Sequence, residues 1–212
     1  MKSLLMCLAV CCLAACAGSA RNASLIEAYD FGLPPRHLPD DDGRWSSVAL
    51  EVSVPSWFDS PGIEYRLLYE NPLKLRSYAG SRWVGAPGLL LSQRLRQQLG
   101  FVGVSGHGAV TCLLRLELQE FSQVFDTPER SRALLQGRAS LLDRGRRVVV
   151  DRLIDIEQAA TTPDARGGVV ALVSVSDELG RQLAAWLNAA WLNDQEKRGT
   201  LKGCRVTAAH YP

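Results

Sequence analysis

Apolar and polar residues alternate along several stretches of this chain, which predicts half-buried β-strands. The first stretch runs from Val48 to Val54 and stops at Pro55. Two strand-like segments, residues 63–68 and 73–78, then flank an Asn-Pro turn and predict a hairpin. Three longer stretches predict an antiparallel meander with one buried and one solvated face. They cover residues 110–119, 133–141 and 148–156.

Two other segments repeat apolar residues every three or four positions, which is the spacing of an amphipathic helix. The first runs from Pro87, a residue favoured in a first helical turn, to about Leu99, and Gly100 ends it. The second runs from roughly Gly168 to Leu192. Such helices pack their apolar stripe on a sheet. We therefore predict an α+β protein, with an antiparallel or mixed β-sheet and two amphipathic helices packed on one face.

The same pattern divides the chain into segments. Residues 47–193 form the predicted α+β domain. Residues 16–46 are small and polar, with clustered prolines and aspartates, and predict a flexible tether with a short strand near Tyr29. Residues 194–212 are polar and predict a C-terminal tail. Residues 1–15 have a different pattern, that of a signal peptide.

This N-terminal segment has the three parts of a secretory signal. Lys2 gives a positive start, an apolar run extends from Leu4 to Leu13, and small residues precede Cys16. The apolar run is too short to cross about 30 Å of hydrocarbon as a helix. The sequence therefore predicts export, with cleavage before Cys16.

The residues at this cleavage site, Leu13-Ala14-Ala15-Cys16, resemble the lipobox of bacterial lipoproteins. The resemblance implies that the thiol of Cys16 takes a diacylglycerol and that Cys16 becomes the new N-terminus. Ala17 follows, and not the aspartate that retains lipoproteins at the inner membrane. This implies an anchor in the outer membrane of a Gram-negative bacterium, on the periplasmic face. An ordinary secretion signal that contains a cysteine is the alternative.

Charge and cysteine content narrow the function classes. The 24 basic and 22 acidic residues leave a formal net charge of +2, so bulk charge gives no reason to expect a nucleic-acid partner. Besides Cys16, the processed chain keeps Cys112 and Cys204, which an oxidising compartment allows to form a disulfide. A buried free thiol at Cys112 is the alternative.

A search for catalytic chemistry finds no coherent set of residues, so we predict a non-enzymatic protein with no catalytic residue, metal or cofactor. The histidines, His37, His107 and His210, lack the helical spacing of a zinc protease. Asp151 and Asp155 share one face of a predicted strand. Cross-strand pairing with neighbouring charges is their expected role.

Aromatic and arginine side chains gather around the predicted hairpin. Such side chains are enriched at protein contacts, where they act as rigid anchors. The candidates for partner binding are Trp57, Phe58, Tyr65, Arg66, Tyr78, Arg82 and Trp83. The alternative is that they fix the hairpin to the sheet. For Trp83 this alternative is favoured, because the residue precedes a helix as a hydrophobic staple does.

These residues also form a recognisable constellation. A strand ending in Val54-Pro55 is followed by an aromatic pair, by Asp-Ser-Pro-Gly-Ile-Glu-Tyr-Arg at 59–66, and by Tyr-Ala-Gly-Ser-Arg-Trp at 78–83. Over roughly residues 27–193 the chain resembles the ABC-type transport auxiliary lipoprotein family (PqiC/YmbA-like). It departs from the family pattern at the turn over 68–72, where a more polar sequence is usual.

The resemblance implies a function in the bacterial envelope. Family members are outer-membrane lipoproteins that accompany transporters with mammalian-cell-entry (MCE) domains, which move phospholipid or other hydrophobic molecules. It therefore implies a non-enzymatic accessory protein that docks to a periplasmic MCE-domain protein and is able to form a homo-oligomer. A different function stays open: an outer-membrane assembly lipoprotein that resembles the barrel plug of lipopolysaccharide assembly.

Overall fold

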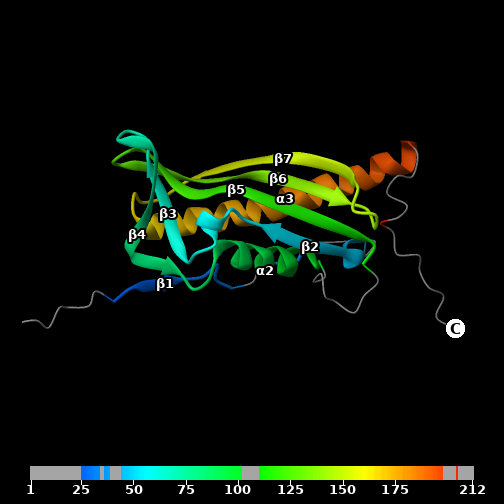
Figure 1. The fold of residues 1–212 in the computed structure, drawn as a ribbon, viewed down its shortest axis with the longest axis horizontal. Coiled ribbons are helices and arrows are strands. Elements are labelled where there is room, and N and C mark those ends of the chain that lie inside the picture. Colours follow the sequence, from blue (N-terminus) through cyan, green and yellow to red (C-terminus); the bar gives the residue numbers. More distant parts are fainter. Residues whose placement is uncertain (1–24, 34–35, 39–43, 102–109, 198–203, 205–212) are drawn as a thin grey trace, which may run out of the picture.

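The central strand of the computed structural model is β5 (Cys112–Thr127), which pairs with three other strands (Figure 1). The structure describes residues 25–33, 36–38, 44–101, 110–197 and 204. Within these residues the sheet has seven strands in the order β1-β4-β3-β5-β6-β7, and β2 pairs with β5. The other strands are β1 (Glu27–Tyr29), β2 (Val48–Ser53), β3 (Gly62–Leu67), β4 (Asn71–Trp83), β6 (Arg130–Leu142) and β7 (Val148–Ala159).

The antiparallel parts of the sheet are those that the sequence predicts. β3 and β4 form a hairpin, and β5, β6 and β7 form a meander. The pattern gave no signal for the parallel pairs: β1 with β4, β2 with β5, and β3 with β5. β5 also continues to Thr127, beyond the predicted end at residue 119. A register shift between Leu118 and Glu120 interrupts the alternation of apolar and polar residues there. The second half of the strand was therefore not predicted from the sequence.

Two helices cover one face of the sheet, so the predicted α+β class is confirmed (Figure 1). Helix α2 (Pro87–Leu99) begins and ends as predicted. Proline occupies its first turn, and Gly100 ends it in the left-handed conformation with φ 68°. Among the described residues, no helix is sufficiently long and apolar to span a membrane.

Helix α3 (Ala165–Lys197) is longer at both ends than the sequence predicted. Asp164 starts the helix, because its Oδ1 accepts the backbone N–H of Gly167 at 2.8 Å. This hydrogen bond lowers the pKa of the Asp164 carboxyl, as does the bond from the Thr162 hydroxyl. The glycines at 167 and 168 concealed this start, since glycine weakens a helical pattern.

One hydrophobic core lies between the sheet and the two helices. It joins Leu91 and Leu95 of α2 and Leu172 and Leu179 of α3 to the inward residues of the sheet. Each of these four leucines is at most 1 % exposed. The opposite face of the sheet is charged, with ion pairs such as Arg138–Asp151 across β6 and β7. The predicted cross-strand role of Asp151 is therefore confirmed.

Part of the predicted tether belongs to the folded domain. β1 pairs with the end of β4, with Glu27 opposite Ser81. Phe31 enters the core, where its ring centroid lies 5.2 Å from that of Trp83. Trp45 is also buried. The predicted domain boundary at residue 46 is therefore corrected. The sequence pattern did not reveal this part of the domain, because its aromatic side chains pack against elements that are distant in sequence. We call residues 25–33 the strap.

Arg94 of α2 fixes the strap to both helices. Its Nε and Nη2 donate to the two carboxylate oxygens of Asp177 in α3, at 2.6 and 2.9 Å. Its Nη1 donates to the backbone carbonyl of Phe31, and to that of Leu33 at 3.1 Å. The Arg94 side chain is only 8 % exposed. One cation therefore satisfies two strap carbonyls and one carboxylate.

Cys204, the described residue of the predicted C-terminal tail beyond helix α3, is tied to the core. Cys204 and Cys112 form a disulfide with a Cα–Cα distance of 5.1 Å, across 92 residues of sequence. The backbone carbonyl of Cys204 accepts the hydroxyl of Thr111 at 2.9 Å and that of Ser47 at 3.2 Å. These bonds place Cys204 beside the start of β5.

Replacing Arg94→Ala is expected to lower the free energy of unfolding by at least about 3 kcal/mol, because it leaves Asp177 and two carbonyls without their donor. Arg181→Ala is the control: this exposed arginine pairs with Glu178 on the same helix, and its loss should cost less than about 1 kcal/mol. Urea unfolding followed by circular dichroism measures both. Equal, small losses would contradict the role of Arg94.

Candidate functional site

Trp57 and Phe58 are neighbours in sequence but have opposite environments. Both lie on the short 3₁₀ helix η3 (Ser56–Phe58), which a hydrogen bond from the Phe58 N–H to the Pro55 carbonyl closes at 2.9 Å. Phe58 is 1 % exposed and Trp57 is 61 % exposed. The buried ring therefore anchors the turn, and the turn presents the indole of Trp57 to solvent.

Two of the seven predicted contact residues belong to the core. Phe58 and Trp83 are each 1 % exposed, so neither side chain is presented to a partner. Trp83 packs near Phe31 and Phe121, with ring centroids 5.2 and 6.3 Å away. Their assignment as partner-binding residues is thus corrected. The alternative interpretation, that such aromatics hold the hairpin in place, applies to them.

Tyr65 of β3 and Tyr78 of β4 form a half-buried pair. Their ring centroids are 4.5 Å apart, and Tyr65 also meets Phe125 edge-on at 6.0 Å. The Tyr78 hydroxyl donates to Oε1 of Gln123 at 2.9 Å. Burial raises the pKa of the Tyr78 hydroxyl, and the nearby Tyr65 raises it further. This pair mainly fixes β3 and β4 against the core.

The two arginines of the set differ in the same way. Arg66 is committed within the domain, since its Nε and Nη2 both donate to Oε2 of Glu120, at 3.2 and 3.0 Å. Glu64 lies near this pair, and burial raises the pKa of its carboxyl. Arg82 is exposed and pairs in register with Gly62. Of the seven candidates, Trp57 and Arg82 are exposed, and the other five are buried or half-buried.

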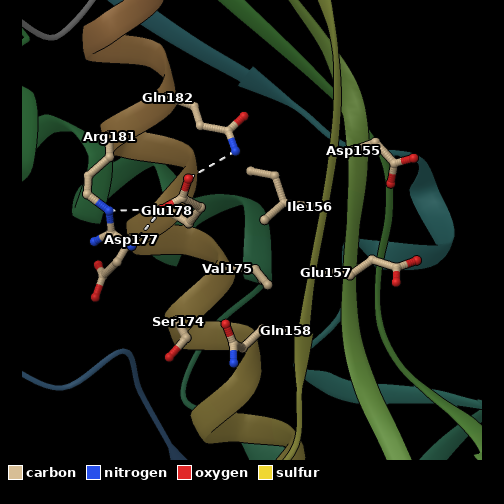
Figure 2. A pocket seen from close by; sticks show the side chains of 10 residues that line it. All are labelled: Asp155, Ile156, Glu157, Gln158, Ser174, Val175, Asp177, Glu178, Arg181 and Gln182. Atoms are coloured by element: carbon tan, nitrogen blue, oxygen red, sulfur yellow. Dashed lines mark hydrogen bonds and ion pairs between the residues drawn. The ribbon is translucent and has the colours of Figure 1, made fainter.

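A groove that the sequence did not predict lies between the edge strand β7 and helix α3 (Figure 2). Its volume is about 530 Å³. Figure 2 shows Ile156 pointing toward the helix and Asp155 and Glu157 pointing away from it. The lining is Asp155, Ile156, Glu157, Gln158, Ser174, Val175, Asp177, Glu178, Arg181 and Gln182.

Most polar groups of this groove already have partners within the chain. Hydrogen bonds from Gln182 and Arg181 lower the pKa of the Glu178 carboxyl and hold it ionised. Asp177 is held by Arg94, and Asp155 accepts a hydrogen bond from Gln136 at 3.2 Å. Within the ranges that the structure describes, no group of three or more His, Cys, Asp or Glu side chains is placed to hold a metal ion.

Several predicted residues lie outside the described part of the chain. These are Cys16, His107 and His210. His37 is described, and its Nδ1 lies 3.3 Å from the carbonyl oxygen of Gln97. That contact helps to position the segment that follows the strap.

Comparisons with known proteins identify the fold. No family model matches the chain, and no curated protein matches it. Among solved structures, the crystal structure of a Xanthomonas campestris protein of the DUF330 family aligns with a TM-score of 0.61 at 17 % identity, covering 82 % of this chain and 96 % of that one. This chain shares the fold of that DUF330 protein.

Two further structures were found. An uncharacterized protein aligns with a TM-score of 0.59 at 16 % identity, over 77 % of this chain and 99 % of that one. A candidate lipoprotein from Caulobacter crescentus aligns with a TM-score of 0.41 at 13 % identity, over 70 % and 95 %. The alignments with the first two structures therefore extend over nearly the whole length of those proteins.

The adjacent pair on η3 gives a direct test of the site. Phe58→Ala should lower the free energy of unfolding by about 3–5 kcal/mol because it empties a core position. Trp57→Ala should change it by less than about 0.5 kcal/mol because the indole is mainly in solvent. Chemical denaturation of the two variants measures the difference. A large loss for Trp57→Ala would mean that its ring also holds the fold.

Proposed function

We propose that this protein is a lipid-anchored lipoprotein on the periplasmic face of the outer membrane. In this proposal it acts as a non-enzymatic docking component of an MCE-domain, ABC-type transport system for phospholipid or another hydrophobic molecule. The DUF330 fold is consistent with the resemblance of the sequence to the transport auxiliary lipoproteins. The lipobox-like residues before Cys16 supply the anchor in this scheme.

The observation that carries the proposal is that the two halves of the sequence motif lie next to each other in the structure. Residues 59–66 and 78–83 are separated in the chain, yet Gly62 pairs with Arg82. The Trp83 N–H donates to the Pro61 carbonyl at 2.7 Å. The constellation that gave the resemblance is therefore one local unit of structure. Within this unit, Trp57 and Arg82 are exposed to solvent.

These two side chains suit a docking surface. Tryptophan and arginine carry much of the binding energy at protein interfaces. Tryptophan offers a large contact area with few flexible bonds, and arginine offers several hydrogen-bond donors. Phe58 anchors the turn that carries Trp57 before any partner arrives, which reduces the backbone entropy lost on binding. Two or more acyl chains on one cysteine would provide stable membrane anchoring that a single chain does not.

The anchor is tested by Cys16→Ser. We expect the wild-type protein to sediment with outer membranes and the variant to be lost from that fraction, because the thiol that carries the lipid is gone. Cys12→Ser is the matched control, since it changes another cysteine of the same segment and leaves the lipobox intact. Immunoblots of separated membranes measure both. Membrane retention of the Cys16→Ser variant would rule out this anchor.

Docking is tested by affinity capture from detergent-solubilised envelopes. Wild-type protein should retain an MCE-domain protein, identified by mass spectrometry, and Trp57→Ala should retain at least about tenfold less. Leu153→Ala is the control, because Leu153 is similarly exposed, at 66 %, on the charged face of the sheet. Recovery of a β-barrel protein in place of an MCE-domain protein would instead support the assembly-factor alternative.

A further inference from the structure

The strap shortens the free chain between the predicted anchor and the domain. From Glu27 onward it is held by pairing with β4, and the Val84 N–H donates to the Tyr29 carbonyl at 2.8 Å. Phe31 is buried, and Arg94 donates to the backbone carbonyls of Phe31 and Leu33. The chain that joins Cys16 to the domain therefore ends near Leu25 and not near residue 46.

This difference changes the reach of the anchor. A fully extended chain spans at most about 3.3–3.6 Å per residue, so nine residues from Cys16 to Leu25 reach roughly 30 Å. Thirty residues, as the sequence pattern predicted, would reach roughly 100 Å. With lipid on Cys16, the short connection keeps the start of the strap near the bilayer surface. The end of the domain that carries the strap start is then held within about 30 Å of the bilayer surface.

That end also carries exposed apolar side chains. Figure 1 places the start of β1 and the tip of the β3–β4 hairpin at the same end of the long axis. The last described part of helix α3 lies at the opposite end. The exposed large apolar residues of the strap start and hairpin tip are Leu25, Ile26, Leu68, Tyr69 and Leu73, with Leu25 92 % and Leu73 89 % exposed.

The hairpin tip is held in a defined shape. The Leu68 N–H donates to the Phe125 carbonyl at 2.9 Å, and the Leu73 N–H donates to Oδ1 of Asn71 at 3.0 Å. Arg76 and Glu70 form an ion pair across the turn. The apolar side chains are thus presented on a braced turn. Lys74 follows them and adds a positive charge that an anionic lipid surface attracts.

We propose that this end of the domain, formed by Leu25, Ile26 and the hairpin tip at residues 68–73, rests on the lipid bilayer that holds the anchor. This inference rests on the proposed lipidation of Cys16. Leucine and tyrosine side chains partition into the boundary between head groups and acyl chains. So small an apolar surface binds lipid weakly by itself. The short connection to the lipidated Cys16 keeps that surface at a high effective concentration near the bilayer, which favours its binding. Helix α3 then extends away from the membrane.

A fluorescence experiment on the lipidated, full-length protein tests this arrangement. The variant Leu73→Cys is labelled with an environment-sensitive fluorophore; Cys16 carries lipid and Cys112 and Cys204 are bonded to each other. Leu192→Cys is the matched control, also exposed, at 60 %. The start of α3 lies beside β1, and Leu192 is about 40 Å along the helix from that start.

The labelled proteins are bound to vesicles of phosphatidylethanolamine and phosphatidylglycerol that contain a lipid with a nitroxide on its head group. We expect the label at position 73 to lose most of its fluorescence and the label at position 192 to keep nearly all of it. Equal quenching at the two positions, or none at either, with the protein still floating with the vesicles would overturn the inference and leave the anchor intact. Failure to float would reject the anchor and the inference together.

A second variant tests whether the short connection orients the domain. Twenty glycine and serine residues inserted between Ala20 and Arg21 should weaken the quenching at position 73 several-fold without preventing flotation. Unchanged quenching would overturn the inference. So would a label at position 73 that stays unquenched on vesicles but responds to added MCE-domain protein, because the tip would then bind protein and not lipid.

Discussion

The structure depends on one strand that must pair with two different partners along the same edge. The first half of β5 pairs in parallel with β2, over residues 112–117, and its second half pairs in parallel with β3, over residues 123–125. The register shift near Leu118 lies between these halves. There Phe121 turns to Phe31 of the strap, with ring centroids 6.1 Å apart. The strap therefore packs on β5 at the point where the parallel partner of β5 changes from β2 to β3.

Close contacts between elements then fix the two helices on the sheet. A Cβ at Gly168 of α3 would lie 2.0 Å from Oε1 of Gln123 in β5. A Cβ at Gly180 would lie 1.9 Å from Oε1 of Gln98 in α2, whose Nε2 donates to the Asp177 carbonyl. Glycine at these positions leaves room for the buried amide groups of Gln123 and Gln98 against the α3 backbone. Arg94 of α2 donates hydrogen bonds both to Asp177 of α3 and to the Phe31 carbonyl of the strap.

These constraints give the domain two distinct ends and a defined place for each exposed feature. The strap and the hairpin tip lie at one end, and the described end of α3 lies at the other (Figure 1). Trp57 stands on a turn that Phe58 anchors, and the groove beside β7 follows the free edge of the described sheet. The proposed function, in which the protein links a membrane to a partner, depends on such fixed directions, because a flexible connection would not transmit orientation.

Local sequence determined the elements whose signals are local. Pro87 and Gly100 placed both ends of α2, and alternation of apolar residues placed the hairpin and the meander. The motif around Tyr65 and Trp83 was likewise visible in the chain, together with the cysteines that form the disulfide.

Tertiary structure alone decided the rest. Phe58 and Trp57 are adjacent large aromatics, and only the packing of η3 against the core buries one and exposes the other. The strap looked like a tether because its stabilising partners, Trp83, Arg94 and Phe121, are distant in sequence. The parallel strand pairs, the groove beside β7 and the pairing of β5 with both β2 and β3 also depend on contacts between segments that are distant in sequence. Periodicity reports which face of a segment is apolar, but it carries no information about which distant segment will cover that face.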